Sequence, residues 1–418
     1  MLIVVGNHQP ARQNDHAAIH HAHLIVEYNA LDSRILQNSL GIGEVHGIVR
    51  FQDFAHGASA FRWVGISPNL ATAAWTGKTS PMSVAEAVKP EIAVTPVERL
   101  HTLVLADMEA ADRLIHQRMA SAVRLIPELA QHLIDSGGKR LRPLLTLAGA
   151  RMADYHGDGH QKLAAAVEFI HTATLLHDDV VDASTLRRGK QAANVIWGNK
   201  PSVLVGDFLL SRAFQLMLET GDLSVLGILA NASAVIAEGE VLQLKSASNL
   251  ATTEDHYLQV VSAKTAALFA AAAEAGPALA KRDRNFVTAL HDYGMNLGIA
   301  FQLVDDALDY SGRQAVMGKT VGDDFREAKM TLPVILAHAR ADEQGRIFWR
   351  RVIESGTQGG DDLNQAIALV EQTGAIRETL RRANAYAAAA CKALEPLPPS
   401  EIHDALVAVA EFCVERAY

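Results

Sequence analysis

Two copies of the motif Asp-Asp-x-x-Asp, each at the end of a long apolar stretch, constrain the fold of this chain most strongly. The copies occupy residues 178–182 and 305–309, and the apolar stretches before them predict helices. On a helix, the first and last Asp of each copy lie one turn apart on a shared face. Two such faces turned toward each other would surround one cavity with carboxylates, and burying that much like charge is prohibitive without cations. The pair of motifs therefore predicts a cation-binding cavity between two helices.

The chemistry of the two motifs favours a metal–diphosphate site. Carboxylate oxygens select hard divalent ions, and Mg²⁺ typically takes one or two carboxylates together with substrate phosphates. A solvated helix end would explain a single Asp-Asp pair. It explains two copies poorly, because both copies are embedded in apolar sequence.

The helix predicted before the first motif also carries an imidazole. Residues 164–177 contain no Gly or Pro, so the helix should run unbroken into the motif. At about 100° per residue, Asp178 and Asp182 each lie within about 20° of His171, one on either side of it. One stripe therefore presents an imidazole and two carboxylates to the same space, whereas we expect His177 to be an ordinary core histidine.

Basic side chains occur in three further segments. Lys139 and Arg142 stand three positions apart just after a Gly-Gly pair, and Arg187 and Arg188 follow the first motif. Near a Mg–diphosphate site, an arginine pair offers bidentate phosphate recognition. Residues 317–329 are polar and contain glycine, as a loop that closes over a substrate should. Each segment taken alone also fits a plain surface loop.

In their order along the chain, these segments resemble the trans-polyprenyl diphosphate synthases, and the long-chain octaprenyl and decaprenyl diphosphate synthases in particular. The shared order is Gly-Gly-Lys-x-x-Arg-Pro, His, Asp-Asp-x-x-Asp with Arg-Arg, Lys264-Thr265, Gln302 three residues before Asp305, and Gly-Lys. The resemblance runs from about residue 84 to the C-terminus, with no departure at these positions.

The resemblance implies an all-α fold, a large single-domain helical bundle of the isoprenoid synthase type around a deep central cavity. The sequence agrees independently. Apolar residues recur at helical spacing after residue 96, and the Ala-rich run at residues 266–273 favours helix. No sustained period-two strand pattern is present after residue 90.

The resemblance also implies a role for each motif residue. The direct metal ligands would be Asp178, Asp182 and Asp305. The catalytic residues would be Asp178, Asp179, Asp182, Arg187, Lys264, Thr265, Gln302, Asp305, Asp306, Asp309 and Lys319. The residues that bind substrate would be Lys139, Arg142, His171, Arg188 and Lys329.

The activity implied is a Mg²⁺-dependent, sequential condensation of isopentenyl diphosphate onto an allylic diphosphate, which makes the chain a prenyltransferase. In the family, a bulky aromatic residue about five positions before the first Asp gives short products. This chain has Ala173 there and Thr174 one position later, so we expect octaprenyl to decaprenyl products of the kind used as ubiquinone side chains.

Three alternatives stay open. The serious one is a short-chain synthase that makes farnesyl or geranylgeranyl diphosphate. A terpene cyclase shares the fold, but its second metal site normally mixes Asn, Ser or Thr with Glu, and here the second Asp motif is whole. A non-catalytic partner subunit of a heteromeric synthase would usually have lost an Asp motif.

Composition fits an enzyme of this class. A chain of 418 residues with 49% hydrophobic content can bury a large core, and a net charge of −9 argues against nucleic acid as a partner. Cys391 and Cys413 suggest reduced thiols in a cytoplasmic protein. No apolar run reaches the ~18 residues of a membrane span. The resemblance implies a homodimer, and we expect the apolar product to pass to a membrane.

The first 81 residues differ from the rest. They hold seven of the eighteen His and show no clear helical periodicity, and a run such as residues 47–51 leaves a strand open. We interpret residues 1–81 as an N-terminal extension, poorly ordered and without a catalytic role. Residues 82–418 would then be the catalytic domain, because Met82 begins a stretch typical of this family's start.

Overall fold

The computed structural model describes residues 94–415, apart from 135–137, 188 and 312–321, together with four short strands before residue 94. The chain divides into two compact units, Met1–Ala93 and Val94–Tyr418. The strands of the first unit are β1 (Ile3–Gly6), β2 (His23–Glu27), β3 (Val49–Gln52) and β4 (Ser59–Arg62).

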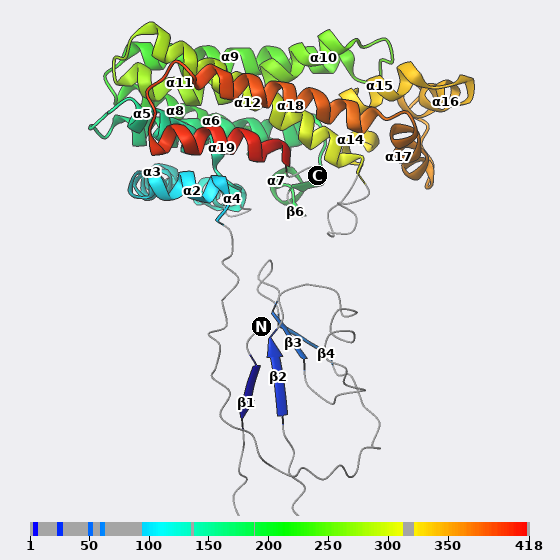
Figure 1. Cartoon of the computed structure of the whole chain (residues 1–418), viewed down its shortest axis with the longest axis horizontal. Coiled ribbons are helices and arrows are strands. Elements are labelled where there is room, and N and C mark those ends of the chain that lie inside the picture. The colour runs from blue at the N-terminus through cyan, green and yellow to red at the C-terminus, as the bar shows by residue number, and fades with distance from the viewer. Residues whose placement is uncertain are drawn as a thin grey trace, which may run out of the picture. The chain divides into compact units, whose positions relative to one another are not determined.

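These strands form one sheet in the order β1-β2-β3-β4, antiparallel except for the parallel pair β2 and β3 (Figure 1). Strand β3 occupies part of the run for which the sequence left a strand open. Most of residues 1–81 fall outside the described residues, so the expectation that they are poorly ordered stays a prediction. The domain boundary at residue 82 also stays a prediction.

The second unit is helical, and the all-α prediction is confirmed. Its first helices are α2 (Pro96–Leu103), α3 (Leu105–Met119), α4 (Leu125–Ile134), α5 (Leu141–Met152), α6 (Gly159–Val181), α7 (Ala193–Trp197), α8 (Asn199–Leu218) and α9 (Leu223–Ser246). Then come α10 (Glu254–Val261), the π-helical turn η1 (Ser262–Ala266), α11 (Ala267–Leu279), α12 (Arg284–Asp309), α14 (Asp323–Arg326) and α15 (Leu332–Arg340). The last are α16 (Glu343–Trp349), the π-helical turn η2 (Arg350–Glu354), α17 (Asp362–Gln372), α18 (Ala375–Leu394) and α19 (Glu401–Glu415).

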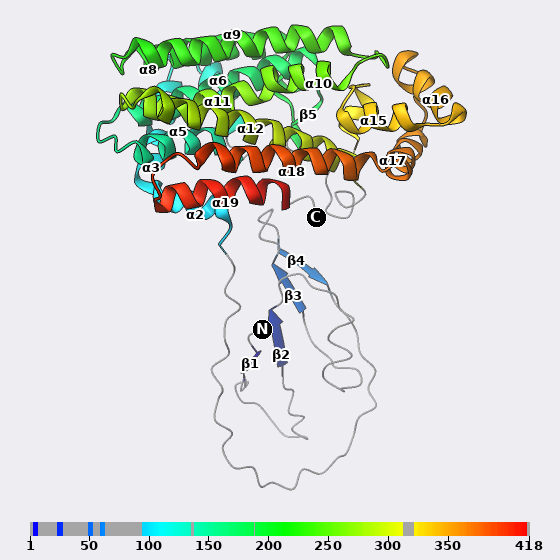
Figure 2. The same cartoon turned by 45° about the horizontal axis from the view of Figure 1, so that its top comes forward.

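Helix α11 lies at the centre of the bundle and packs against α5, α9 and α12 (Figures 1 and 2). Its Ala-rich sequence explains this position, because small side chains let neighbouring backbones approach closely and nearly every residue of the helix is buried. Glycines on the partner helices extend the effect. A Cβ added to Gly294 of α12 would lie 2.5 Å from the carbonyl oxygen of Phe269, so the α11–α12 contact requires glycine there.

Two long helices cover one side of the bundle. Helix α8 packs on α6, and α9 packs on α11 and η1; Figure 2 shows α9 along the upper edge. Among the described residues, both helices are long and apolar enough to cross a membrane by length and composition alone. The expectation that no segment reaches that length was wrong, because these helices carry apolar side chains on outward faces as well as inward ones.

Candidate active site

Both Asp motifs lie at the carboxyl ends of long helices. Helix α6 ends at Val181 with Asp182 as its C-cap, and α12 ends at Asp309. The last carbonyl groups of a helix lack intrahelical partners, and the helix dipole makes this end electronegative. Carboxylates added at two such ends produce a region that only cations can stabilise.

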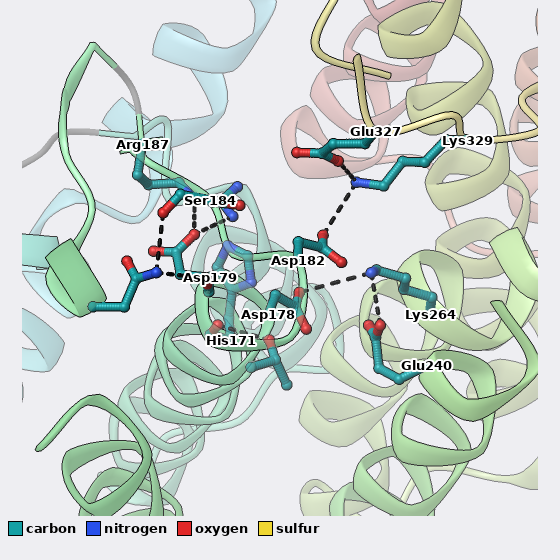
Figure 3. A network of polar contacts seen from close by, with 12 residues as sticks. His171, Asp178, Asp179, Asp182, Ser184, Arg187, Glu240, Lys264, Glu327 and Lys329 are labelled. Atoms are coloured by element: carbon teal, nitrogen blue, oxygen red, sulfur yellow. Dashed lines mark hydrogen bonds and ion pairs between the residues drawn. The ribbon is translucent and has the colours of Figure 1, made fainter. Parts of the chain in front are cut away.

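The side chains of the first motif point in two directions, because successive residues of a helix are about 100° apart. Asp178 and Asp182 face two lysines on the far side of the cavity (Figure 3). The Lys264 Nζ lies 3.9 Å from Asp178 Oδ2, and the Lys329 Nζ donates to Asp182 Oδ2 at 3.1 Å. The predicted stripe of Asp178 and Asp182 is therefore present and is met by two cations.

Asp179 points away from these lysines and is fully buried. Arg187 donates to its Oδ1 from Nε at 2.8 Å, and Arg187 itself lies in the short hairpin of β5 (Leu186–Arg187) and β6 (Lys190–Gln191). The Asn194 side chain donates to the Asp179 carbonyl oxygen at 2.8 Å. The Asp179 carboxylate thus holds the β5–β6 hairpin in place through its hydrogen bond with Arg187.

Two carboxylates of the second motif accept hydrogen bonds from other groups of the protein. Asp306 is buried and accepts hydrogen bonds from the Tyr257 hydroxyl and from Gln302 Nε2, the latter at 2.7 Å. Asp309 accepts from the backbone N–H groups of Gly322 at 3.1 Å and Asp324 at 3.0 Å, which holds the start of α14 against the end of α12. The remaining member, Asp305, is exposed.

Burial and like charge shift several pKa values in this region. Burial raises the pKa of Asp178 to about 7, although Lys264 partly opposes the shift. Burial likewise raises the pKa of Asp306 to about 7 against the hydrogen bonds from Tyr257 and Gln302. For Lys329, burial lowers the pKa, but Asp182, Asp324 and Glu327 together outweigh burial and the net pKa is raised. The carboxylates are therefore short of compensating positive charge.

The described residues contain no group of three His, Cys, Asp or Glu side chains arranged to hold a metal by themselves. Asp178 and Asp182 nevertheless present oxygen donors on one face of α6, and burial raises the pKa of Asp178, which is therefore short of positive charge. Mg²⁺ is usually bound by one or two carboxylates with phosphate oxygens and water in its other positions. The residues fit a divalent ion shared with a diphosphate and do not form an all-protein cage.

Lys264 and Thr265 lie on the π-helical turn η1, between α10 and α11. A π turn inserts one extra residue into a helix, and such turns are frequent at functional sites. Here the turn directs Lys264 and Thr265 to the cavity. Thr265 Oγ1 donates to Gln302 Oε1 at 2.9 Å, and Gln302 in turn donates to Asp306. The structure thus joins the Lys-Thr pair, the Gln and the second Asp motif in one network.

The structure brings together two of the residues assigned to a basic pocket. Arg142 Nη1 lies 3.3 Å from His171 Nε2, and the Arg142 Cζ lies over the Phe269 ring, 4.3 Å from its centroid. The Lys139 Nζ lies 5.6 Å from the centre of the Phe412 ring. Two further predicted residues, Arg188 and Lys319, lie outside the described residues.

A cavity of about 440 Å³ lies between the two motifs, and its lining includes Asp182, Lys264, Thr265, Gln302, Asp306 and Lys329. Sequence reasoning missed three residues in this region. Glu240 of α9 accepts from Lys264 at 2.7 Å, Tyr257 of α10 binds Asp306, and Asp324 lines the cavity. Only Asp324 carried a signal in the sequence, an Asp-Asp pair after glycine in the segment proposed to close over substrate.

The two proposed chain-length residues lie on α6 before the first motif. Ala173 is buried, with 2% of its surface exposed, and the Thr174 hydroxyl donates to the carbonyl oxygen of His171 at 2.8 Å. The α6 face one turn below Asp178 therefore carries small side chains. The role of Ala173 and Thr174 stays a prediction.

Comparison with known proteins gives a consistent result. The polyprenyl synthetase family model matches residues 123–370. Octaprenyl diphosphate synthase from Escherichia coli (strain K12) is 43% identical over 321 residues, which cover 77% of this chain and 99% of that protein. A solved decaprenyl diphosphate synthase from Rhodobacter capsulatus is 56% identical over 77% of this chain and all of that one, with a TM-score of 0.75.

A polyprenyl synthase from Caulobacter crescentus CB15, solved with calcium and isoprenyl diphosphate, is 54% identical over 78% of this chain and 99% of that one, also with a TM-score of 0.75. The fold and these matches define an all-α prenyltransferase. The chain belongs to the polyprenyl synthetase family, so the resemblance drawn from the motifs is confirmed. Enzymes of this family generally depend on divalent metal ions.

Proposed function

We propose that this chain is a Mg²⁺-dependent, all-trans long-chain polyprenyl diphosphate synthase that condenses isopentenyl diphosphate onto an allylic diphosphate. The observation that carries the proposal is the placement of Asp178 and Asp182 on one face of α6, opposite Lys264 and Lys329 in one cavity. Relatives that are 41–43% identical are named octaprenyl and nonaprenyl diphosphate synthases, which supports the long-chain assignment.

The allylic diphosphate binds between the two Asp motifs, with Asp178, Asp182 and Asp305 as the residues that hold the metal. These carboxylates would hold a bound Mg²⁺, which would supply positive charge against the diphosphate. Lys264 and Lys329 donate to the departing phosphate oxygens, and Arg187 and Lys319 add positive charge. Preorganised electrostatics of this kind is usually the largest catalytic contribution.

The C–O bond of the allylic substrate breaks, and its electron pair leaves with the diphosphate. The oxygen atoms of Thr265 and Gln302, fixed by their 2.9 Å hydrogen bond, direct their dipoles at the allylic cation without capturing it. The π electrons of the isopentenyl double bond then form the new C–C bond. A proton leaves the resulting cation, and we assign the released diphosphate as its acceptor.

Isopentenyl diphosphate binds in the basic pocket of Arg142, His171, Lys139 and Arg188. The contact between Arg142 and His171, together with the Phe269 ring beneath Arg142, supports a pocket in which the Arg142 guanidinium is held in place before substrate binds. The planar guanidinium offers a fork of donors that matches phosphate oxygens.

The product grows past Ala173 and Thr174 to octaprenyl to decaprenyl length, for use as a quinone side chain. Small side chains at this turn of α6 put no large ring in the path of the growing tail. Such an apolar product has to leave for a membrane, where its tail is solvated.

We also propose that the enzyme works in the cytoplasm as a homodimer. Large apolar side chains are exposed on α8 and α9: Val203, Leu204, Phe214, Leu218, Leu223, Val241 and Leu244. Many exposed large apolar side chains on two neighbouring helices are typical of an interface. Light scattering of the purified chain should give twice its mass of 45.0 kDa, and a monomer at working concentration would contradict the dimer.

One experiment tests the activity. The purified chain is incubated with labelled isopentenyl diphosphate, an allylic primer and Mg²⁺, and the dephosphorylated products are sized by reversed-phase chromatography. We expect linear products of octaprenyl to decaprenyl length. Farnesyl or geranylgeranyl products would support the short-chain alternative, cyclic hydrocarbons a terpene cyclase, and no condensation a partner subunit.

A further inference from the structure

Lys264 lies between two carboxylates that come from different helices (Figure 3). Its Nζ is 2.7 Å from Glu240 Oε2 of α9 and 3.9 Å from Asp178 Oδ2 of α6. We propose that Glu240 is a positioning residue that holds Lys264 back from Asp178 and so leaves this carboxylate to a divalent cation. The inference rests on the proposed function and adds a residue that the motifs do not include.

The position of Glu240 relative to Lys264 is set by close backbone packing. A Cβ added to the preceding residue, Gly239, would lie 2.9 Å from the backbone nitrogen of Lys264 and 2.8 Å from the Ala263 Cβ. Only glycine therefore allows α9 to approach the π-helical turn this closely. Because the two backbones are in contact, the Glu240 carboxylate is in place for Lys264 before any substrate arrives.

Among the described residues, the Glu240 carboxylate pairs with Lys264 through one of its two oxygens. Its side chain is 22% exposed, and its other oxygen, Oε1, is buried without a hydrogen-bond partner among the described residues. A partly buried carboxylate with a single partner gains most of its stabilisation from that ion pair. Lys264 is thus held by Glu240 and stands just beyond hydrogen-bond distance from Asp178.

Removing the Glu240 charge would release Lys264 to its other neighbour. The lysine side chain is flexible and carries three donors, and the remaining gap to Asp178 is closed by a small rotation. A lysine bound directly to Asp178 competes with a divalent ion for the same oxygen. Glu240→Gln should therefore weaken metal binding through Lys264, and it should do so only while Lys264 is present.

A measurement of Mn²⁺ binding tests this without relying on turnover. Purified full-length variants are titrated with Mn²⁺ in the presence of inorganic diphosphate, and free Mn²⁺ is read from its electron paramagnetic resonance signal. Glu240→Gln should weaken Mn²⁺ binding by at least roughly fivefold, the lower end of typical coupling between two sites. Glu240→Asp, which keeps the charge, should restore part of the affinity.

Two controls separate this role from a structural one. Glu219→Gln removes a partner from another 2.7 Å ion pair, with Arg118, and should leave Mn²⁺ binding unchanged. In a Lys264→Met background, Glu240→Gln should have no further effect. Unchanged Mn²⁺ binding in Glu240→Gln, or a loss that persists without Lys264, would overturn the inference. Either of these two results overturns the role of Glu240 alone. The proposed function still stands if the wild type makes polyprenyl products.

Discussion

Lys329 donates to Asp182 at 3.1 Å across 147 positions of the sequence. Asp182 caps the carboxyl end of α6, and Lys329 follows α14, so this ion pair closes the cavity between the first motif and the segment after the second. Asp182 and Asp324 raise the pKa of Lys329 in spite of burial. The lysine is therefore charged at any working pH and provides a fixed cation for a diphosphate.

The first prediction concerns the metal-binding carboxylates. Asp178→Ala and Asp305→Ala should each reduce turnover by roughly 10²–10³-fold, the cost of losing a preorganised electrostatic element. Circular dichroism should show an unchanged helical fold, because both variants keep Asp309, which holds the backbone N–H groups at the start of α14. Near-normal turnover of either variant at saturating Mg²⁺ would rule out a metal-bridged diphosphate.

The second prediction separates the two substrate pockets. Lys139→Ala and Arg142→Ala should mainly raise KM for isopentenyl diphosphate, because they supply ground-state charge pairing. Arg187→Ala should act mainly through the allylic substrate, and it should also lower Tm because it leaves Asp179 buried without its partner. The double variant Arg187→Ala/Asp179→Asn controls for that buried charge. Equal effects of all three single variants on both substrates would show that the basic residues are divided wrongly.

The third prediction is that residues 1–81 are dispensable. A chain starting at Met82 should fold, dimerise and retain Mg²⁺-dependent turnover, because every described site residue lies in the unit Val94–Tyr418. Size-exclusion chromatography and steady-state kinetics of the truncated and full chains provide the comparison. Aggregation or lost turnover of the shorter chain would show that the extension contributes to the catalytic unit.

The fourth prediction tests the determinant of product length. Ala173→Phe introduces a ring at a buried position of α6, and overpacking a filled site typically costs ~1–3 kcal/mol. The variant should still ionise its primer, because the metal site lies a turn above, but products should shorten to about three or four isoprene units. Chromatography of dephosphorylated products from wild type and variant decides the matter. Unchanged long products would place the growing tail along another face.

The fifth prediction is a pH dependence of stability. His291 Nδ1 lies 3.1 Å from Glu274 Oε1, and this hydrogen bond raises the His291 pKa above its ordinary value. A raised folded-state pKa stabilises the fold fully below the unfolded pKa of about 6.5 and ceases to do so as pH rises through the folded value. His291→Gln should therefore lower Tm more near about pH 6 than near about pH 8.5. The exposed His116 gives the control variant His116→Gln, and a Tm loss independent of pH would contradict the charged pair.

The sequence by itself determined the helical class, the family and the stripe on α6. Helical periodicity operates over three or four residues, so the shared face of Asp178 and Asp182 could be derived without a structure. The Ala-rich run that became the central helix α11 was visible for the same reason. The order of the motifs then indicated the family, which the comparisons confirmed.

Only the tertiary structure decided how the charges are paired. Asp179 binds Arg187, Asp306 binds Tyr257, and Asp309 holds backbone N–H groups of the α14 segment. The sequence had predicted instead that the carboxylates of both motifs surround one cavity. The contact of Glu240 with Lys264 spans 24 positions and depends on how closely α9 approaches a π-helical turn. Such partners are set by packing between helices distant in sequence, and no local periodicity encodes that distance.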